Sequence, residues 1–170
     1  MRKALFIVIL FCFSCKNNLL HKLDKPVENR ISKKEAIERV SPEQRSAMEW
    51  LITHMPENDI KSLSLEFLIT NSEYTFKAKK HFSWAMHVPD QIFLNYVLPY
   101  ANLNERRDEW RKDFFYKFSP LVKNANSAYE GAAILNNKIF EMVGVEYSTK
   151  RPKADQSPYE SIEAGLASCT

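Results

Sequence analysis

The chain has 170 residues, with 24 Lys and Arg against 21 Asp and Glu. This length predicts about one domain, and a composition of 45% hydrophobic and 26% charged residues excludes wholesale disorder. The three glycines (Gly131, Gly144 and Gly165) are too few for a glycine-rich phosphate loop or a dinucleotide fingerprint. Three cysteines exclude a disulfide scaffold, and a net charge of +3 gives no basis for a nucleic-acid partner.

The first 14 residues have the pattern of a secretion signal. Arg2 and Lys3 precede an apolar run over residues 4–13, which is too short to span a bilayer but suits the core of a signal peptide. Ser14 and Cys15 follow directly and resemble the cleavage site of a bacterial lipoprotein, although Leu is usual where Cys12 stands. We therefore expect a signal peptide over residues 1–14 and a lipid on Cys15. That lipid would anchor the protein in the bacterial cell envelope, at the outer membrane or its periplasmic face.

Other interpretations of this segment are a plain signal peptide or an uncleaved membrane anchor. Cys12-x-x-Cys15 also has redox-pair spacing, but an apolar signal run is a poor setting for one. Loss of Arg2 and Lys3 with the signal leaves 22 basic and 21 acidic residues, so nothing indicates an anionic partner. Residues 15–34 are polar and contain Pro26, which predicts a tether between the anchor and the body of the protein.

Residues 35–148 predict a mainly α region made of capped helices. A helix begins at Ser41-Pro42-Glu43-Gln44 and ends before Pro56. Three more helices are expected. The first has one apolar face made of Leu65, Leu68, Ile69, Ser72 and Phe76, and the second is short and covers residues 90–97. The third is capped by Asn104, carries a stripe of Trp110, Phe114 and Phe118, and breaks near Pro120.

Another helix is predicted to begin at the capping box Ser127-Ala128-Tyr129-Glu130 and to end at Gly144, before a short strand over residues 145–148. A last short helix is expected from Ser157-Pro158 to Gly165.

The charge run over residues 104–112 predicts a solvated helix face. Tryptophans and phenylalanines at helical spacing indicate core packing, and no histidine pair has the spacing of a zinc site, so neither a metal nor a cofactor is expected.

The last residues before the C-terminus, Gly165 to Thr170, place a lone cysteine after the short capped helix. A cysteine nucleophile acts as its thiolate, which the N-terminus of a following helix stabilises, and the same backbone N–H groups bind an oxyanion. From spacing alone, a lone cysteine near a terminus such as Cys169 is more often a buried or incidental thiol than a nucleophile.

Residues 71–170 resemble the N-terminal part of bacterial secreted transglutaminase-like proteins. The phrase Phe93-Leu94-Asn95-Tyr96-Val97-Leu98-Pro99-Tyr100 followed by Glu105 and Trp110-Arg111 is its most specific part. The other residues that carry the resemblance are Met55-Pro56, Leu65, Leu68, Trp84, Val88-Pro89, Leu135-Asn136, Ser157-Pro158 and Ser168-Cys169-Thr170.

The resemblance implies an α+β, papain-like catalytic core that begins over residues 149–170, with Cys169 as the nucleophile of a Cys-His-Asp triad. It also implies acyl transfer or hydrolysis at an amide of a peptide or protein, through a thioester. The family's His and Asp follow the cysteine, whereas here only Thr170 does. We therefore expect this chain to be a truncated N-terminal fragment that is itself inactive. The alternative is a non-catalytic helical lipoprotein module for binding or scaffolding, in which Cys169 is incidental.

Overall fold

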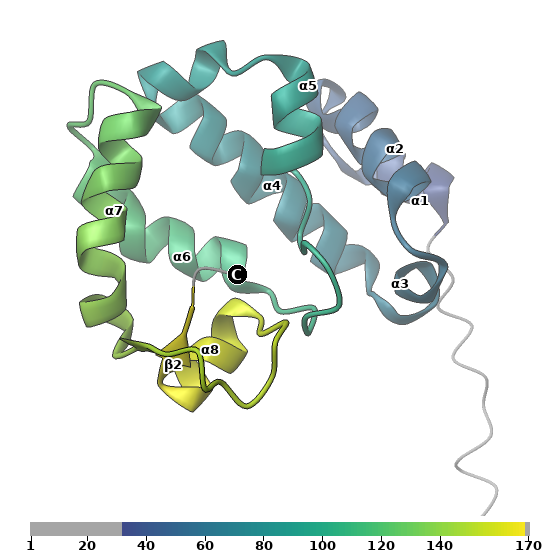
Figure 1. Ribbon diagram of the computed structural model, residues 1–170. Helices are drawn as coiled ribbons and strands as arrows, with labels where there is room; N and C mark the ends of the chain where they lie inside the picture. Colours follow the sequence, from purple (N-terminus) through teal and green to yellow (C-terminus); the bar gives the residue numbers. More distant parts are fainter. Residues whose placement is uncertain (1–31, 169–170) are drawn as a thin grey trace, which may run out of the picture.

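The computed structural model describes residues 32–168, and this part of the chain is mainly helical, as the sequence predicts (Figure 1). The elements in chain order are α1 (Lys33–Arg39), η2 (Pro42–Gln44), α2 (Arg45–His54), α3 (Glu57–Ser62), α4 (Leu65–His81), η3 (Ser83–His87), α5 (Asp90–Ile92), η4 (Phe93–Val97), α6 (Trp110–Phe118), η5 (Ser119–Val122), α7 (Ala128–Val143), β1 (Glu146–Tyr147), α8 (Pro158–Ala164) and β2 (Leu166–Ala167).

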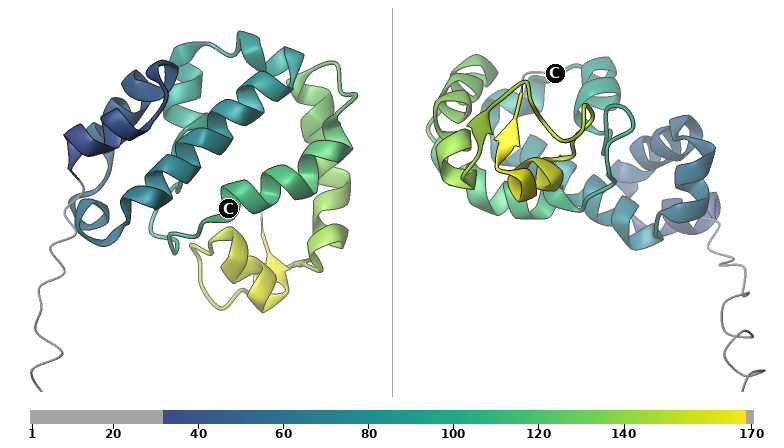
Figure 2. Two further views of the ribbon diagram at one scale, coloured as in Figure 1. Left: turned by 180° about the vertical axis from the view of Figure 1, so that it is seen from behind. Right: turned by 60° about the horizontal axis from the view of Figure 1, so that its bottom comes forward.

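The long helix α4 runs between two groups of elements. Helices α1, α2 and α3 lie on one side of it, and α6, α7 and α8 lie on the other (Figures 1 and 2). Apolar residues at helical spacing on α1, α2 and α4 form one hydrophobic core with the segment that follows α5. Its most buried members are Ala36, Met48, Leu51, Leu68, Phe93 and Leu98.

The predicted helix ends are largely those observed. Helix α2 ends at His54, two residues before Pro56, and the side chain of Gln44 accepts a hydrogen bond from the backbone N–H of Ser41 at 3.1 Å. Ser127 Oγ caps α7 by accepting from Glu130 N, and Gly144 ends α7 in the left-handed conformation with φ of 68°. The turn chemistry that the sequence indicates therefore operates at both of these helices.

The C-terminal group of elements has a thinner core. Gly131 is the only buried residue in α7, although that helix carries an apolar stripe whose members are half-buried: Ile134, Leu135, Ile139, Phe140 and Val143. After α7, β1 pairs in parallel with β2, with Glu146 opposite Leu166. This two-stranded sheet is the only one in residues 32–168.

Several expectations from the sequence are wrong in detail. Helix α1 begins at Lys33, inside the expected tether, and α3 and β2 were not predicted. Residues 90–97 form a turn of α-helix followed by a π-helical turn, with Leu98 N donating to Phe93 O at 2.8 Å. Tyr96, which lies in this π-helical turn, is 79% exposed.

The largest error concerns residues 104–112. Asn104 does not cap a helix, because α6 begins only at Trp110 and the preceding residues are non-helical. Glu105 accepts hydrogen bonds from the backbone N–H groups of Asn102 and Leu103, which gives this stretch an alternative to helical hydrogen bonding. The charge run is thus a loop, and Asp108, with a side chain 8% exposed, is far from solvated.

Two glycines of the C-terminal group allow a matched test of backbone conformation. We expect Gly144→Ala to lower the free energy of unfolding by about 1 kcal/mol, because an alanine there must adopt a positive φ while its Cβ meets nothing within 4 Å. Gly131→Ala is the control: the residue lies within α7, and we expect a gain of about 0.5–1 kcal/mol from helix propensity. Urea unfolding of both variants measures this, and equal effects would contradict the assignment of the left-handed cap.

Candidate functional site

The loop between η4 and α6 is held by its own charged residues. Glu105 Oε2 accepts from Leu103 N at 2.7 Å, and Arg107 Nη1 donates to the carbonyl oxygen of Glu105 at 2.6 Å. Burial raises the pKa of the Glu105 carboxyl, but the backbone hydrogen bonds and Arg107 outweigh it and hold the pKa below its ordinary value. Glu105 therefore carries its negative charge at neutral pH.

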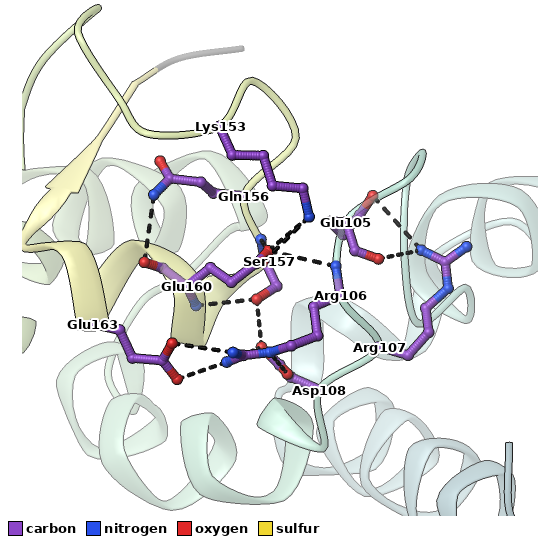
Figure 3. Close-up of polar contacts among 9 residues, drawn as sticks. All are labelled: Glu105, Arg106, Arg107, Asp108, Lys153, Gln156, Ser157, Glu160 and Glu163. Carbon is purple, nitrogen blue, oxygen red and sulfur yellow. Dashed lines mark hydrogen bonds and ion pairs between the residues drawn. The ribbon is translucent and has the colours of Figure 1, made fainter. Parts of the chain in front are cut away.

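Arg106 connects this loop to α8, which lies 57 residues away in the sequence (Figure 3). Its Nη1 and Nη2 donate to the two carboxylate oxygens of Glu163 at 3.0 and 2.7 Å, and its Nε donates to Asp108 Oδ1 at 2.6 Å. These two carboxylates raise the pKa of Arg106 above its ordinary value. The paired geometry specifies where α8 sits relative to the loop.

Ser157 and Glu160 complete the connection (Figure 3). Ser157 Oγ accepts from Glu160 N at 3.0 Å, and Glu160 Oε2 accepts from Ser157 N at 2.9 Å, so the predicted capping box of α8 is present. Ser157 Oγ also donates to Asp108. Although a hydroxyl beside a carboxylate is an arrangement found at nucleophiles, Ser157 is fully buried and its oxygen serves the helix cap. We assign it a structural role.

On the other side of the loop, Arg107 faces the N-terminal group of helices. Its Nε donates to Asp59 Oδ2 at 3.0 Å, and Tyr100 Oη donates to the same oxygen at 2.7 Å. Burial of the Tyr100 phenol raises its pKa above the ordinary value, and the hydrogen bond to Asp59 contributes a further, smaller increase. The loop is thereby tied to α3 as well as to α8.

An open cleft of about 490 Å³ lies between the segment 96–111 and the start of α8. We call it the Arg111 cleft, and it is lined by Tyr96, Val97, Pro99, Tyr100, Ala101, Asn102, Glu105, Trp110, Arg111, Gln156, Pro158 and Ser161. Most of the phrase singled out in the sequence borders this cleft together with Pro158: Tyr96, Val97, Pro99, Tyr100, Glu105, Trp110 and Arg111. The fold thus brings together motif residues that are more than 40 positions apart in the chain.

Arg111 is the most unusual side chain of the cleft. Its Nε donates to Asn71 Oδ1 at 2.7 Å, its Nη2 donates to Pro99 O at 2.7 Å, and its guanidinium lies over the Trp110 ring, 4.6 Å from the centroid. No carboxylate of residues 32–168 forms an ion pair with it. Burial lowers the pKa of Arg111 to about 10, so the half-buried group remains protonated at neutral pH.

The two cysteines predicted as site residues, Cys15 and Cys169, lie outside the described residues. Of the histidines within them, His54 stacks on Trp50 with ring centroids 4.3 Å apart, and His81 packs edge-on against Phe82 and Phe115. Within residues 32–168, no three His, Cys, Asp or Glu side chains gather in a way that would hold a metal ion.

Sequence reasoning missed the connection between Arg106, Asp108 and α8 and also missed the unpaired charge of Arg111. Both depend on contacts across 40 or more residues, and alternating charges in a short run carry no signal of such contacts. The one local signal was the capping box at Ser157. It located the start of α8 but gave no indication that Ser157 contacts Asp108.

Comparisons with protein-family models, curated proteins and solved structures find no match to this chain. Among the described residues, no helix has both the length and the apolar character needed to cross a bilayer.

We expect Glu160 to make folding pH-dependent. Hydrogen bonding from Ser157 N, together with Lys153, lowers the pKa of Glu160 to about 2 from 4.5. A carboxyl with a lowered pKa in the folded state stabilises it fully above the ordinary pKa and loses this contribution as the pH falls towards 2. The difference in urea midpoint between wild type and Glu160→Gln should therefore be largest at pH 7 and shrink below pH 4.5.

Glu141→Gln removes an exposed carboxylate of α7 and serves as the control for that experiment. A constant difference between wild type and Glu160→Gln from pH 7 to pH 2.5 would contradict the assigned role of Glu160.

Proposed function

We propose that this chain is the helical N-terminal region of a lipid-anchored cell-envelope protein with a transglutaminase-like catalytic core. In this proposal Cys15 carries the lipid and Cys169 is the nucleophile. The full-length protein is a cysteine-dependent amide hydrolase or acyltransferase that acts on peptides or proteins. Residues 1–170 without the rest of the core are inactive.

The observation that supports this proposal most is the Arg111 cleft. Residues of the family phrase, including Tyr96, Trp110 and Arg111, border one cleft together with Pro158, the start of the last helix before Cys169. Pro158 follows Arg111 by more than 40 positions in the chain, and the fold brings both residues to the same cleft.

Two features of the C-terminal group agree with a larger α+β core. The apolar stripe of α7 is only half-buried, and a helix with such a stripe is stabilised when a sheet or another helix covers it. The pair β1–β2 has only two residues in each strand, which is too small to be stable alone. In the proposed protein, β2 leads within two residues to Cys169, and further strands extend this sheet.

The proposed reaction begins with attack of the Cys169 thiolate on an amide carbonyl carbon. The new C–S bond forms, the C–N bond breaks, and the amine leaves with a proton from the general acid of the triad. Water or a second amine then attacks the thioester and restores the thiol. The His and Asp of the triad belong to sequence that follows Cys169 in the longer protein that the proposal requires.

The alternative is a non-catalytic helical lipoprotein module that binds or scaffolds a partner. It is favoured by the continuous hydrophobic core of α1, α2 and α4, which needs no further domain to bury its central residues Met48 and Leu68.

The anchor is tested by growing cells with a radioactive fatty acid. We expect label on the wild-type protein and none on Cys15→Ala, because the thiol of Cys15 is the proposed attachment point. Cys12→Ala is the matched control and should keep its label. Undiminished label on Cys15→Ala would refute the lipoprotein interpretation.

The catalytic proposal is tested with the product of the natural gene, including all sequence encoded after codon 170. We expect it to release ammonia or amine from glutamine-containing peptides, and to form hydroxamates when hydroxylamine traps the thioester. Cys169→Ala should lower the rate by about a thousandfold or more, because it removes the nucleophile.

Cys15→Ala is the control for that experiment, because loss of the anchor should leave the rate on soluble peptides unchanged. A gene that ends at codon 170, or activity that survives in Cys169→Ala, would favour the non-catalytic alternative.

A further inference from the structure

Two tyrosines and two lysines of the packed helices α4 and α6 form a cluster that the proposed function does not use. Lys77 Nζ donates to Tyr116 Oη at 3.2 Å, and the hydroxyl oxygens of Tyr74 and Tyr116 are 3.3 Å apart. Lys112 Nζ lies 6.0 Å from the centroid of the Tyr74 ring. Tyr74 is buried, whereas Tyr116 is 56% exposed. One phenol therefore lies at the surface beside a second phenol and two ammonium groups, and we call this set the Tyr116 cluster.

Aromatic rings hold the ammonium group of Lys77 in the cluster. Its Nζ lies 5.0 Å from the ring centroid of Tyr74, 5.1 Å from that of Phe115 and 5.0 Å from that of Tyr116. Such cation–π contacts stabilise a positive charge over the faces of the rings. No carboxylate of residues 32–168 forms an ion pair with Lys77 or Lys112, so no paired negative charge offsets either of them.

These neighbours determine which of the two phenols ionises first. The hydrogen bond from Tyr74, followed by the hydrogen bond and the charge of Lys77, lowers the pKa of Tyr116 below its ordinary value. The pKa of Tyr74 is raised to about 12 by its hydrogen bond with Tyr116, then by burial and by the charge of Glu73. Tyr74 thus keeps its proton and donates it to the oxygen of Tyr116, which also accepts from Lys77.

Two further titratable side chains lie on the same helices. Asp113, one turn before Tyr116, accepts a hydrogen bond from Tyr159 Oη at 3.1 Å. His81 packs edge-on against the ring of Phe115, with centroids 5.6 Å apart. Within residues 32–168 neither forms a hydrogen bond with Tyr116. The ionisation of Tyr116 is therefore governed by the second phenol and the two ammonium groups of the cluster.

We propose that Tyr116 is a site of covalent modification by activated acyl donors, at which its phenolate oxygen, held between Lys77 and Tyr74, attacks the acyl carbon. The phenol first loses its proton to water. The new C–O bond then forms, the bond between the acyl carbon and the leaving group breaks, and the leaving group departs with the bonding electrons and takes up a proton from water. The product is a tyrosine ester, and Lys77 stays protonated throughout.

Three other tyrosines are more exposed but lack these surroundings. Tyr129 is 86% exposed, Tyr96 is 79% exposed and Tyr147 is 63% exposed. Within residues 32–168 their hydroxyls form no hydrogen bond. If accessibility alone decided the reaction, all three would react faster than Tyr116, so they are internal controls.

The experiment treats the purified chain with a limiting amount of N-acetylimidazole at neutral pH and follows each acetylated tyrosine by peptide mass spectrometry. We expect Tyr116 to react at least about threefold faster than Tyr96, Tyr129 or Tyr147, because a lower pKa raises the ionised fraction of a nucleophile more steeply than it lowers its intrinsic nucleophilicity. Hydroxylamine, which removes acetyl groups from phenol oxygens but not from lysine amines, verifies that the bond is to oxygen.

Four variants identify the groups responsible. Lys77→Gln keeps a hydrogen-bond donor but removes the charge, and we expect the rate at Tyr116 to fall about threefold or more, whereas Lys77→Arg should keep most of it. Tyr74→Phe keeps the buried ring but removes the hydroxyl, and we expect a fall of about two- to threefold. Lys138→Gln, at an exposed position of α7, removes a charge outside the cluster and should leave the rate unchanged.

Acetylation of Tyr116 that is no faster than that of Tyr129 would overturn the proposal, and this comparison needs only the wild-type chain. An unchanged rate at Tyr116 in Lys77→Gln would overturn it as well. The site does not involve Cys15 or Cys169, so the outcome is independent of the anchor and of the catalytic core.

Discussion

The side chain of Asn71 determines how the two groups of helices are joined. From the middle of α4, its Nδ2 donates to Leu98 O at 2.9 Å and its Oδ1 accepts from Arg111 Nε at 2.7 Å. Arg111 in turn donates to Pro99 O. One buried amide therefore fixes the course of the backbone after Leu98 and the start of α6. Because unsatisfied buried polar groups are costly, each member of this set holds the others in place.

The Arg111 cleft is a consequence of that arrangement. Asn71 positions Arg111, and Arg106 and Asp108 position α8 opposite it, so the two walls of the cleft are set by separate polar contacts. The wall formed by residues 96–101 also belongs to the hydrophobic core, of which Leu98 and Tyr100 are buried members. The charge-assisted hydrogen bonds from Arg106 to Glu163 and from Ser157 to Asp108 hold α8 in place and so maintain the shape of the cleft.

Local sequence patterns predicted much of the fold. Pro56, Ser127, Gly144, Ser157 and Gly165 marked helix ends correctly, since capping acts between residues only three or four positions apart. The expected helix at Asn104 was wrong because Glu105 binds backbone N–H groups in its own loop. The cleft and the partners of Asp108 and Arg111 could not be predicted, because they depend on contacts between segments 40 or more residues apart.

The sequence by itself determined the mainly helical character, the boundaries that capping sets, and the two cysteines, Cys15 and Cys169, on which the functional proposal depends. Only the tertiary structure decided that Arg106 pairs with Glu163, that Ser157 meets Asp108, and that Arg111 is half-buried with no carboxylate partner among residues 32–168. The reason is the separation in sequence between the residues that interact. Helix signals depend on neighbours within a turn, whereas the polarity of a cleft depends on which distant segments the packing of α4 brings together.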